Sequence, residues 1–161
     1  MNQRIVQSPI GNLLLGAQDG KLVQVRLLEE GEGIACSSAD DPVLEQAEKQ
    51  LSEYFAGERK TFDLPLALHG TAFEQMVWQQ LLDIPFGSIS SYGRIAQRLG
   101  KQSASRAVGG ACSRNPLLIV VPCHRVVAVS GRLTGFAAGL AAKHKLLTLE
   151  GHMIKNDCII E

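Results

Sequence analysis

A cysteine, a histidine and an arginine follow one another inside an apolar run, the segment "VVPCHRVV" at residues 120–127. A free cysteine thiol has a pKa of about 8.5, so only a few per cent of it is thiolate at neutral pH. A neighbouring base or a positive field raises that fraction, and His124 and Arg125 supply one residue of each kind. We therefore take Cys123 as the candidate nucleophile and His124 as its candidate base.

The backbone limits how these two side chains can meet. Neighbouring residues on a strand point to opposite faces, so His124 reaches the thiol only if the chain turns after Pro122 or if a water lies between them. The alternative is that Cys123 is a small buried apolar residue without chemistry. We give the other three cysteines that interpretation: Cys36, Cys112 and Cys158.

Cysteine and histidine spacing argues against two kinds of site. The sequence contains no C-x-x-C pair and no Cys or His pair at metal-ligand spacing. We therefore expect neither a disulfide framework nor a metal site. No cofactor-binding motif is present either, and we expect no cofactor.

Length and composition describe an ordinary globular protein. The chain has 161 residues, of which 45% are hydrophobic and 20% are charged, enough for one domain or two small ones. No apolar run is long enough to cross a bilayer, and the start "MNQRIVQSPIG" lacks the pattern of a signal peptide. We expect a cytoplasmic protein with no membrane partner.

The net charge of zero hides an uneven distribution. Residues 1–70 carry six Lys and Arg against eleven Asp and Glu, whereas residues 71–161 carry ten against five. A basic second half predicts a polyanionic partner for that half, although chance could also divide the charges in this way.

The first half is predicted to form a small sheet and a helix. Turn-forming residues at 9–11 and 19–20 separate runs rich in Val, Leu and Ile, as in hairpins. Asp41 before Pro42 is the pattern of a helix N-cap followed by a proline at the first helical position. We assign residues 1–70 to an N-terminal sheet and helix domain that supports the rest structurally.

The second half is predicted to be mainly helical. Thr71 and Glu74 form a capping box at the start of one helix, and Ser90 or Ser91 begins a shorter helix that stops at Gly100.

Three more elements are expected further along the chain. A third helix should be capped near Ser103 and end at residues 115–116. The run "LLIVVPC" should be a buried strand, and "AAGLAAKHKLLTLEG" should be the last helix, ending at Gly151. The fold class is therefore α+β, with a second domain over residues 71–161.

The two short helices joined across Gly100 are typical of a helix-turn-helix. The second of them is nearly bare of side chains, with Ala104, Ala107, Gly109, Gly110 and Ala111. Such a helix either packs tightly on another helix or approaches a narrow groove closely. Nearby basic residues favour the groove, because they could contact phosphates: Arg94, Arg98, Lys101, Arg106 and Arg114.

The second half also resembles a known family. The run "NPLLIVVPCHRVV" followed by "SGRLTGFAAGLAAKHKLLTLEGH" is similar to the O6-alkylguanine-DNA alkyltransferases, also called methylated-DNA–protein-cysteine methyltransferases. The match extends from about Phe73 to His152 and includes "IPFGSISSYGRIAQRLG", "SRAVGGA" and "RNP"; the first half resembles the family more loosely. A sister group without enzymatic activity has tryptophan in place of Cys123, so the cysteine here favours activity.

The resemblance implies a catalytic role for each of five residues. Cys123 would accept the alkyl group, and His124 would take the thiol proton through a bound water. Glu150 would orient His124 and stabilise its charged form. Asn115 would tie down the turn that carries the cysteine, and Tyr92 would donate a hydrogen bond to the guanine ring as it leaves.

The resemblance also implies how DNA is held. The helix-turn-helix would dock in the minor groove, and Arg106 would fill the gap left by a flipped nucleotide. The backbone carbonyls of Cys123 and Val126 would read the guanine amino group. The expected DNA-binding residues are Arg106, Ala107, Gly109, Ser103 and Arg94, and the expected substrate pocket comprises Val126, Phe136, Ala137 and Ala138.

The pocket departs from the usual family pattern. Tyrosine is usual where this chain has Phe136, and small or hydroxyl residues are usual at Ala137 and Ala138. The methyl group of Ala138, in place of a common glycine, predicts faster repair of methyl adducts than of benzyl adducts.

The implied function is DNA repair. The protein would transfer an alkyl group from O6-alkylguanine, and from O4-alkylthymine, to its own Cys123 once per molecule. The substrate nucleotide would be extruded from double-stranded DNA, at a cost of a few kcal/mol. The protein would be monomeric in solution and cooperative on DNA. The alternatives are a helix-turn-helix DNA-binding protein without chemistry and a Cys-His hydrolase or thiol-redox enzyme.

Overall fold

The structure is a computed structural model that describes residues 1–33 and 40–160. Cys36 lies outside the described residues. The chain divides into two compact units, one formed by Met1–His69 with Pro116–Leu118 and the other by Gly70–Asn115 with Ile119–Glu161. Among the described residues no helix is long and apolar enough to cross a membrane.

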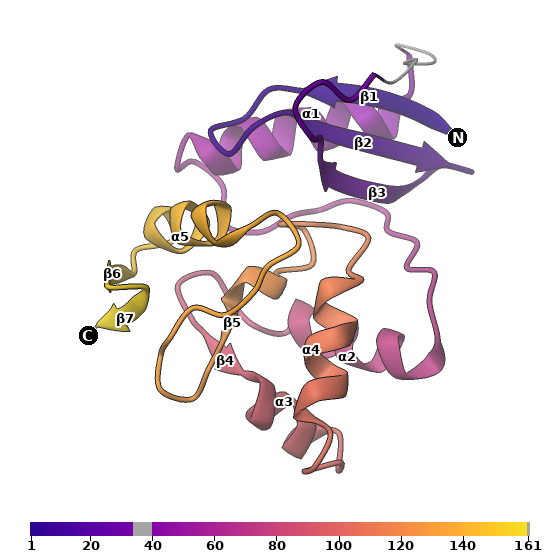
Figure 1. Cartoon of the computed structure of the whole chain (residues 1–161). Coiled ribbons are helices and arrows are strands. Elements are labelled where there is room, and N and C mark those ends of the chain that lie inside the picture. The colour runs from indigo at the N-terminus through magenta and orange to yellow at the C-terminus, as the bar shows by residue number, and fades with distance from the viewer. Residues whose placement is uncertain (34–39, 161) are drawn as a thin grey trace. The chain divides into compact units, whose positions relative to one another are not determined.

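The first unit is a three-stranded antiparallel sheet with one helix on it. Its strands are β1 (Asn2–Val6), β2 (Leu13–Gln18) and β3 (Lys21–Leu27), paired in the order β1-β2-β3, and α1 (Pro42–Phe55) contacts all three. Figure 1 shows this helix behind the sheet. The predicted turn at residues 19–20 is confirmed, since Asp19 and Gly20 both have a positive φ. The predicted start of the helix is confirmed too, because Asp41 Oδ1 accepts a hydrogen bond from the Val43 N–H.

In its described residues, the second unit contains four α-helices, one turn of 3-10 helix and two small pairs of strands. The helices are α2 (Ala72–Leu82), α3 (Tyr92–Arg98), α4 (Ser105–Ser113) and α5 (Leu140–Leu149). β4 (Ser90–Ser91) pairs in parallel with β5 (Val126–Val127), and β6 (Met153–Lys155) forms a hairpin with β7 (Cys158–Ile160). Together with the first unit, this confirms the α+β fold class.

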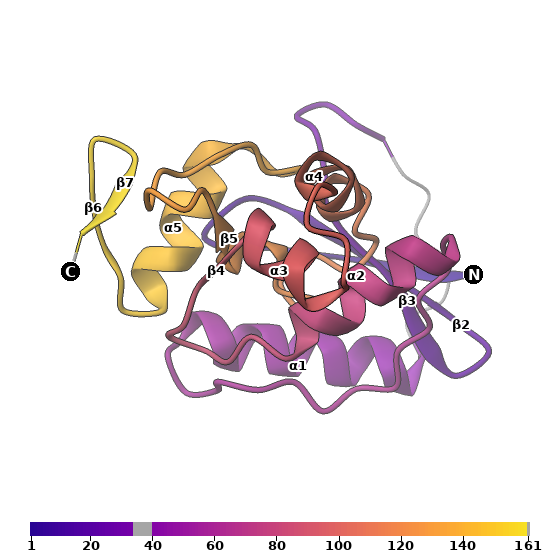
Figure 2. The same cartoon turned by 90° about the horizontal axis from the view of Figure 1, so that it is seen from below.

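Side-chain caps confirm where α2 and α3 begin. Thr71 and Glu74 form the predicted reciprocal capping box of α2. Ser91 caps α3 by accepting from the Arg94 N–H at 3.1 Å. α3 packs beside α4, as the view in Figure 2 shows, so the predicted helix-turn-helix pair is present.

The predicted cap of α4 is wrong. The helix begins at Ser105, its N-cap position is Ala104, and no side chain caps it. Ser103 is exposed and belongs to a turn that the Ala104 N–H closes by bonding to the carbonyl of Lys101. Because this turn takes the residues after α3, the helix starts one position later than a cap at Ser103 would give.

The predicted strand over "LLIVVPC" is also wrong. Leu117 alone makes a bridge, to Val25 of β3, and the chain then turns at Ile119, whose φ is 72°. A positive φ at a β-branched residue interrupts a strand. The prolines on either side lack an N–H to donate to a ladder. The run is nevertheless buried, as its apolar residues predicted.

The C-terminal hairpin was not predicted. Asn156 and Asp157, both at positive φ, make its turn. Ile154 and Ile159 then pack on a core cluster formed by Val127, Leu133 and Leu147. The Asn-Asp pair between short apolar runs was the signal in the sequence that could have revealed it.

Candidate active site

A single turn of 3-10 helix presents Cys123. The element η1 (Cys123–Arg125) follows Pro122, and the Cys123 N–H donates to the carbonyl of Val121 at 2.8 Å. Asn115 Nδ2 donates to the same carbonyl at 2.7 Å and to Cys123 Sγ at 3.2 Å. The amide of Asn115 therefore fixes both the turn and the sulfur, and the chain turns after Pro122 as the proposed meeting of Cys123 with His124 required.

His124 is fully buried and bound to Glu150. Its Nε2 lies 2.7 Å from Glu150 Oε2, and its Nδ1 has no hydrogen-bond partner among the described residues. Glu150 also receives Arg125, through Nε at 2.7 Å and Nη2 at 3.1 Å, while Arg125 Nη1 donates to the carbonyl of Ile84. Arg125 thus holds the carboxylate that faces the histidine.

The pKa values define the protonation state at rest. Burial would raise the pKa of Glu150, but hydrogen bonds from His124 and Arg125 outweigh it and lower the pKa to about 2. Burial lowers the pKa of His124, against the effect of its hydrogen bond to Glu150, which raises it. At neutral pH a neutral imidazole therefore faces a carboxylate, Nε2 carries the proton, and Nδ1 keeps a lone pair.

The thiol is protonated at rest. Burial raises the pKa of Cys123 to about 11, and the Asn115 hydrogen bond and the Lys143 charge lower it by less. The prediction that neighbouring residues raise the thiolate fraction is therefore wrong for the resting protein, because the desolvation of Cys123, a residue only 3% exposed, outweighs their effect on the pKa. Burial also raises the pKa of Cys112, to about 12, in keeping with an unreactive thiol.

Two residues that the sequence analysis did not identify, Thr134 and Lys143, complete the centre. The hydroxyls of Tyr92 and Thr134 share a hydrogen bond of 2.7 Å. Lys143 Nζ donates to the carbonyls of Val126 and Thr134. Burial raises the pKa of Tyr92, so the phenol keeps its proton at neutral pH. The apolar spacing of α5 gave no signal that one of its lysines points inward.

A cavity of about 530 Å³ lies beside this centre. Five of the predicted site residues line it, and they come from α3, α4 and the loop before α5: Tyr92, Arg106, Gly109, Phe136 and Ala137. Cys123, Val126 and Ala138 do not line it. The ring of Phe136 meets the His124 ring edge to face, with the centroids 6.4 Å apart.

The small residues of α4 differ in exposure, since Ala107 is exposed, Gly109 is half-buried and Ala111 is buried. The buried residues of the helix are Val108, Ala111 and Cys112. A methyl group added at Gly109 would meet only the Tyr92 ring, at 3.8 Å. This geometry argues against tight helix packing as the reason for that glycine.

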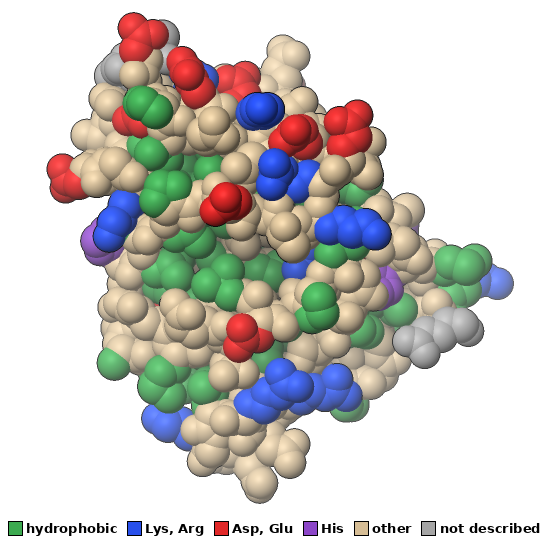
Figure 3. All heavy atoms as spheres, turned by 180° about the vertical axis from the view of Figure 1, so that it is seen from behind, with side chains coloured by type: hydrophobic (Ala, Val, Ile, Leu, Met, Phe, Trp, Pro, Cys, Tyr) green, Lys and Arg blue, Asp and Glu red, His purple; other side chains and the backbone are tan. Residues whose placement is uncertain are grey.

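The basic residues near α4 differ in their surroundings. Arg94 and Arg106 are exposed, as is Ala107. Arg114 instead forms an ion pair with Glu74. On the face shown in Figure 3, several Lys and Arg side chains lie together near the bottom of the view.

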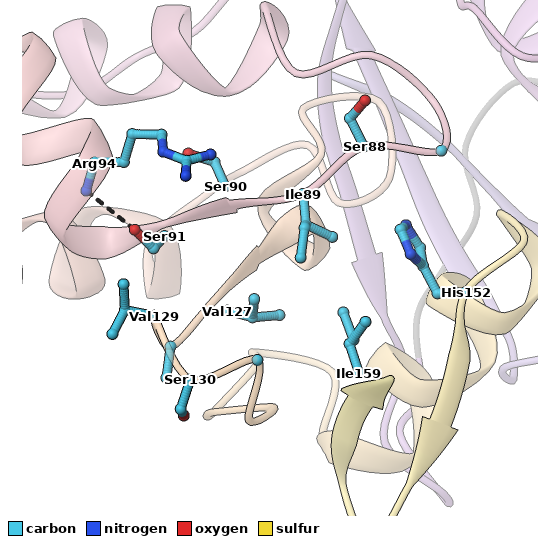
Figure 4. Close-up of a pocket in the computed structure, with 13 residues that line it drawn as sticks. Ser88, Ile89, Ser90, Ser91, Arg94, Val127, Val129, Ser130, His152 and Ile159 are labelled. Carbon is cyan, nitrogen blue, oxygen red and sulfur yellow. Dashed lines mark hydrogen bonds between the residues drawn. The ribbon is translucent and has the colours of Figure 1, made fainter. Parts of the chain in front are cut away.

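A second cavity of about 610 Å³ lies beside the β4–β5 pair. Figure 4 shows Arg94 and Ser90 at one end of it, His152 at another, and Val127 and Ile159 along its wall. The smaller cavity is lined by Tyr92 and by Phe136, whose ring lies against that of His124, so we assign the chemistry to the smaller cavity. In the described part of the chain, no group of three His, Cys, Asp or Glu side chains could hold a metal.

Comparison with known proteins covers both halves of the chain. Residues 72–152 match the family described as 6-O-methylguanine DNA methyltransferase, DNA binding domain. Residues 1–68 match 6-O-methylguanine DNA methyltransferase, ribonuclease-like domain.

Individual relatives agree with the family match. A methylated-DNA–protein-cysteine methyltransferase of Methanosarcina acetivorans is 44% identical over 154 residues, which cover 94% of this chain and 99% of the relative. The protein of the same name from Mycobacterium tuberculosis is 45% identical over 152 residues, covering 93% and 92%. The crystal structure of M. tuberculosis OGT in complex with DNA superposes with a TM-score of 0.84 at 44% identity, covering 93% of this chain and 92% of that one. The chain therefore belongs to the 6-O-methylguanine DNA methyltransferase family.

Proposed function

We propose that this chain is a methylated-DNA–protein-cysteine S-methyltransferase that repairs DNA. It transfers a methyl or larger alkyl group from O6 of guanine, and from O4 of thymine, to Cys123, once per molecule. The observation that carries the proposal is the buried centre itself, in which Asn115 holds the sulfur and Glu150 holds His124 in a chain of this family.

The proton of the thiol leaves first. At rest Cys123 is protonated and His124 is neutral, with a lone pair on Nδ1. A bound water relays the proton from Sγ to Nδ1, and the ionised Glu150 stabilises the imidazolium that forms. The thiolate of Cys123 therefore forms only when His124 takes the proton and is not present at rest.

The thiolate then attacks the alkyl carbon. A sulfur–carbon bond forms, the bond from that carbon to O6 breaks, and its electron pair moves onto guanine. Tyr92 donates a proton to the ring and later regains one from solvent, to which His124 releases the thiol proton, so the net exchange is a thiol hydrogen for an alkyl group. A thioether is stable, and no group in the centre could cleave it, which limits each molecule to one transfer.

Double-stranded DNA containing the alkylated base is the proposed partner. α4 approaches the minor groove through Ala107 and Gly109, Arg94 contacts phosphate, and Arg106 enters the stack where the nucleotide has swung out. Ser103, in the turn before α4, contacts the backbone. The half-buried Gly109 and the exposed Ala107 and Arg106 support this approach.

The substrate base is read in the pocket. The carbonyls of Cys123 and Val126 accept hydrogen bonds from the guanine 2-amino group. Phe136, Ala137 and Ala138 form the wall beside the alkyl group.

The remaining assignments complete the proposal. Residues 71–161 bind DNA and accept the alkyl group, and residues 1–70 support them. The protein works as a monomer that binds cooperatively along DNA. It is cytoplasmic, where a reducing environment keeps the thiol free.

Intact-protein mass spectrometry tests the transfer. After incubation with DNA containing O6-methylguanine, the wild-type protein should gain one methyl group and no more, and Cys123→Ala should gain none. A helix-turn-helix protein without chemistry would gain no mass, and a Cys-His hydrolase or thiol-redox enzyme would turn over repeatedly. Either result would reject the proposal.

Adduct size gives a second test of the pocket. Ala138 directly follows Ala137, which lines the cavity, and we expect its methyl group to narrow the room for a large adduct, so O6-benzylguanine should react more slowly than O6-methylguanine. Competition between the two adducts in otherwise identical DNA measures the ratio. Ala138→Gly should bring the two rates closer, and equal rates in the wild-type protein would contradict the assignment.

A further inference from the structure

Lys143 is a fully buried lysine that the proposed mechanism does not use. It lies on α5, none of its surface is exposed, and its Nζ donates to the carbonyl of Val126 at 2.6 Å and to that of Thr134 at 3.2 Å. Burying an ammonium group is costly unless hydrogen bonds compensate for the lost water. An apolar residue could fill the same space without that cost. The function of the charged group is therefore sought in the two carbonyls to which it donates.

The two carbonyls belong to two segments with different proposed roles, one that accepts a hydrogen bond from the guanine base and one that anchors the donor to it. Val126 directly follows the turn that carries Cys123, and its carbonyl is a proposed acceptor for the guanine amino group. Thr134 lines the cavity, and its hydroxyl shares a hydrogen bond of 2.7 Å with Tyr92, the proposed donor to the guanine ring. One ammonium group therefore connects the segment of the acceptor with the segment that anchors the donor.

We propose that Lys143 is a positioning residue for base recognition, which sets the place of the Val126 carbonyl relative to Tyr92 so that the pocket prefers a purine with a 2-amino group. The inference deepens the proposed function and rests on it. A carbonyl oxygen has two lone pairs, so the ammonium can hold one while the other accepts from the base. A hydrogen bond from a charged donor is stronger than a neutral one and fixes the orientation more firmly.

The surroundings of Lys143 keep it a donor. Burial lowers the pKa of Lys143 to about 8, against the effect of Cys123 and Cys112, which raise it. At neutral pH the ammonium form remains the main one, with three N–H groups to donate.

Removal of the 2-amino group from the substrate tests this role. Single-turnover methyl transfer would be measured on O6-methylguanine and on O6-methylhypoxanthine, which lacks that amino group, in the same DNA sequence. Three proteins would be compared: wild type, Lys143→Met, and Lys145→Met as a control at an exposed lysine of the same helix.

The ratio of the two rates is the informative quantity. The wild-type protein should prefer guanine, and Lys143→Met should reduce that preference roughly three- to tenfold, the size of one ordinary hydrogen bond. Lys145→Met should leave the ratio unchanged. A purely structural role for Lys143 would slow both substrates by the same factor.

Each other outcome overturns the inference in a recognisable way. An unchanged ratio in Lys143→Met, or equal rates on both bases in the wild-type protein, rejects the positioning role but leaves the proposed function standing. A wild-type protein that takes up no methyl group rejects the proposed function itself. If Lys143→Met does not fold, Lys143→Gln carries the same test, because its shorter amide cannot span both carbonyls.

Discussion

Different side chains around Cys123 hold the sulfur in place and provide the base that can take its proton. Asn115 fixes the sulfur in place, and His124 with Glu150 provides a base that is uncharged until a proton arrives. A thiol with a pKa of about 11 is poorly reactive toward the many electrophiles a protein meets. Reactivity then depends on a substrate and a water that bring Sγ and Nδ1 of His124 into line, which suits a protein that can react only once.

Asn115 allows a test at this scale. Asn115→Ala removes the hydrogen bonds to Cys123 Sγ and to the Val121 carbonyl. Since a hydrogen bond to a charged group contributes about 1.5–3 kcal/mol, methyl transfer should slow roughly ten- to a hundredfold. DNA affinity should stay close to wild type, because the side chain is buried behind the cysteine turn.

Single-turnover kinetics and fluorescence anisotropy with labelled DNA separate these two effects. Asn12→Ala, a change of the same type at an exposed position, is the control. A loss of DNA affinity equal to the loss of rate would show that Asn115 acts on binding rather than on the thiol.

At this scale, sequence predicted the members of the centre better than their links. The motif around Cys123 indicated His124, and the resemblance indicated Glu150 and Asn115, which the structure brings together. Thr134 and Lys143 were missed because neither stands in a pattern that marks chemistry. Only the fold shows that the lysine points inward at two carbonyls.

Among the elements, α4 is a helix with two adjacent glycines, Gly109 and Gly110, and with exposed residues at Arg106 and Ala107. A glycine inside a helix costs about 1 kcal/mol relative to alanine. At Gly109 an added methyl group would meet nothing closer than the Tyr92 ring at 3.8 Å, so packing does not require the glycine. We infer that the space above Tyr92 is kept open for the substrate.

Gly109→Ala should therefore change stability and activity in opposite directions. The fold should gain up to about 1 kcal/mol from the better helix former. Methyl transfer should slow roughly tenfold or more, since one extra methyl in a pocket shifts binding by about 1–3 kcal/mol. Thermal unfolding and single-turnover kinetics measure the two effects. Gly33→Ala, at a glycine with nothing within 4 Å of the added carbon, is the control.

If Gly109→Ala were both less stable and less active, the glycine would serve packing, and the inference about open space would fail.

The starts of α1, α2 and α3 followed local rules, whereas the start of α4 and the apolar run before Cys123 did not. Asp41, Thr71 and Ser91 cap helices as predicted because a cap depends on the next few residues alone. The apolar residues 117–121 are compatible with a buried strand and with a buried turn, and the pattern does not distinguish the two. In the structure, Ile119 has a φ of 72°, which makes the segment a turn. The turn is what places Cys123 next to Asn115.

For the molecule as a whole, the buried ionised groups make stability depend on pH. The pKa of Glu150 falls from 4.5 to about 2 on folding, and the pKa of His124 is also lowered. A lowered pKa in the folded state means that the unfolded chain binds more protons, so stability rises with pH. Both groups contribute fully above the histidine's ordinary pKa of 6.5 and lose that contribution as the pH falls.

The free energy of unfolding should accordingly decline from about pH 6.5 downwards. The share of Glu150 is about 3 kcal/mol, lost between pH 4.5 and pH 2 as its carboxylate is protonated. Trp78 is the one tryptophan of the chain, and it is buried in the same unit with its indole N–H bound to the Ala111 carbonyl at 2.9 Å. Its fluorescence during urea unfolding at a series of pH values therefore reports the stability of this unit.

Glu150→Gln isolates the contribution of the carboxylate. The variant leaves Arg125 buried without its anion, so it should be less stable at pH 7 by about 3–5 kcal/mol. It should also lose stability less steeply between pH 4.5 and pH 2 than the wild-type protein, because it has no carboxyl group to protonate at that site. Glu45→Gln, at an exposed position of α1, should keep the wild-type slope. Equal slopes in Glu150→Gln and the wild-type protein would mean that other carboxylates govern acid unfolding, and that the ion pair beneath His124 orients the histidine without holding the fold together.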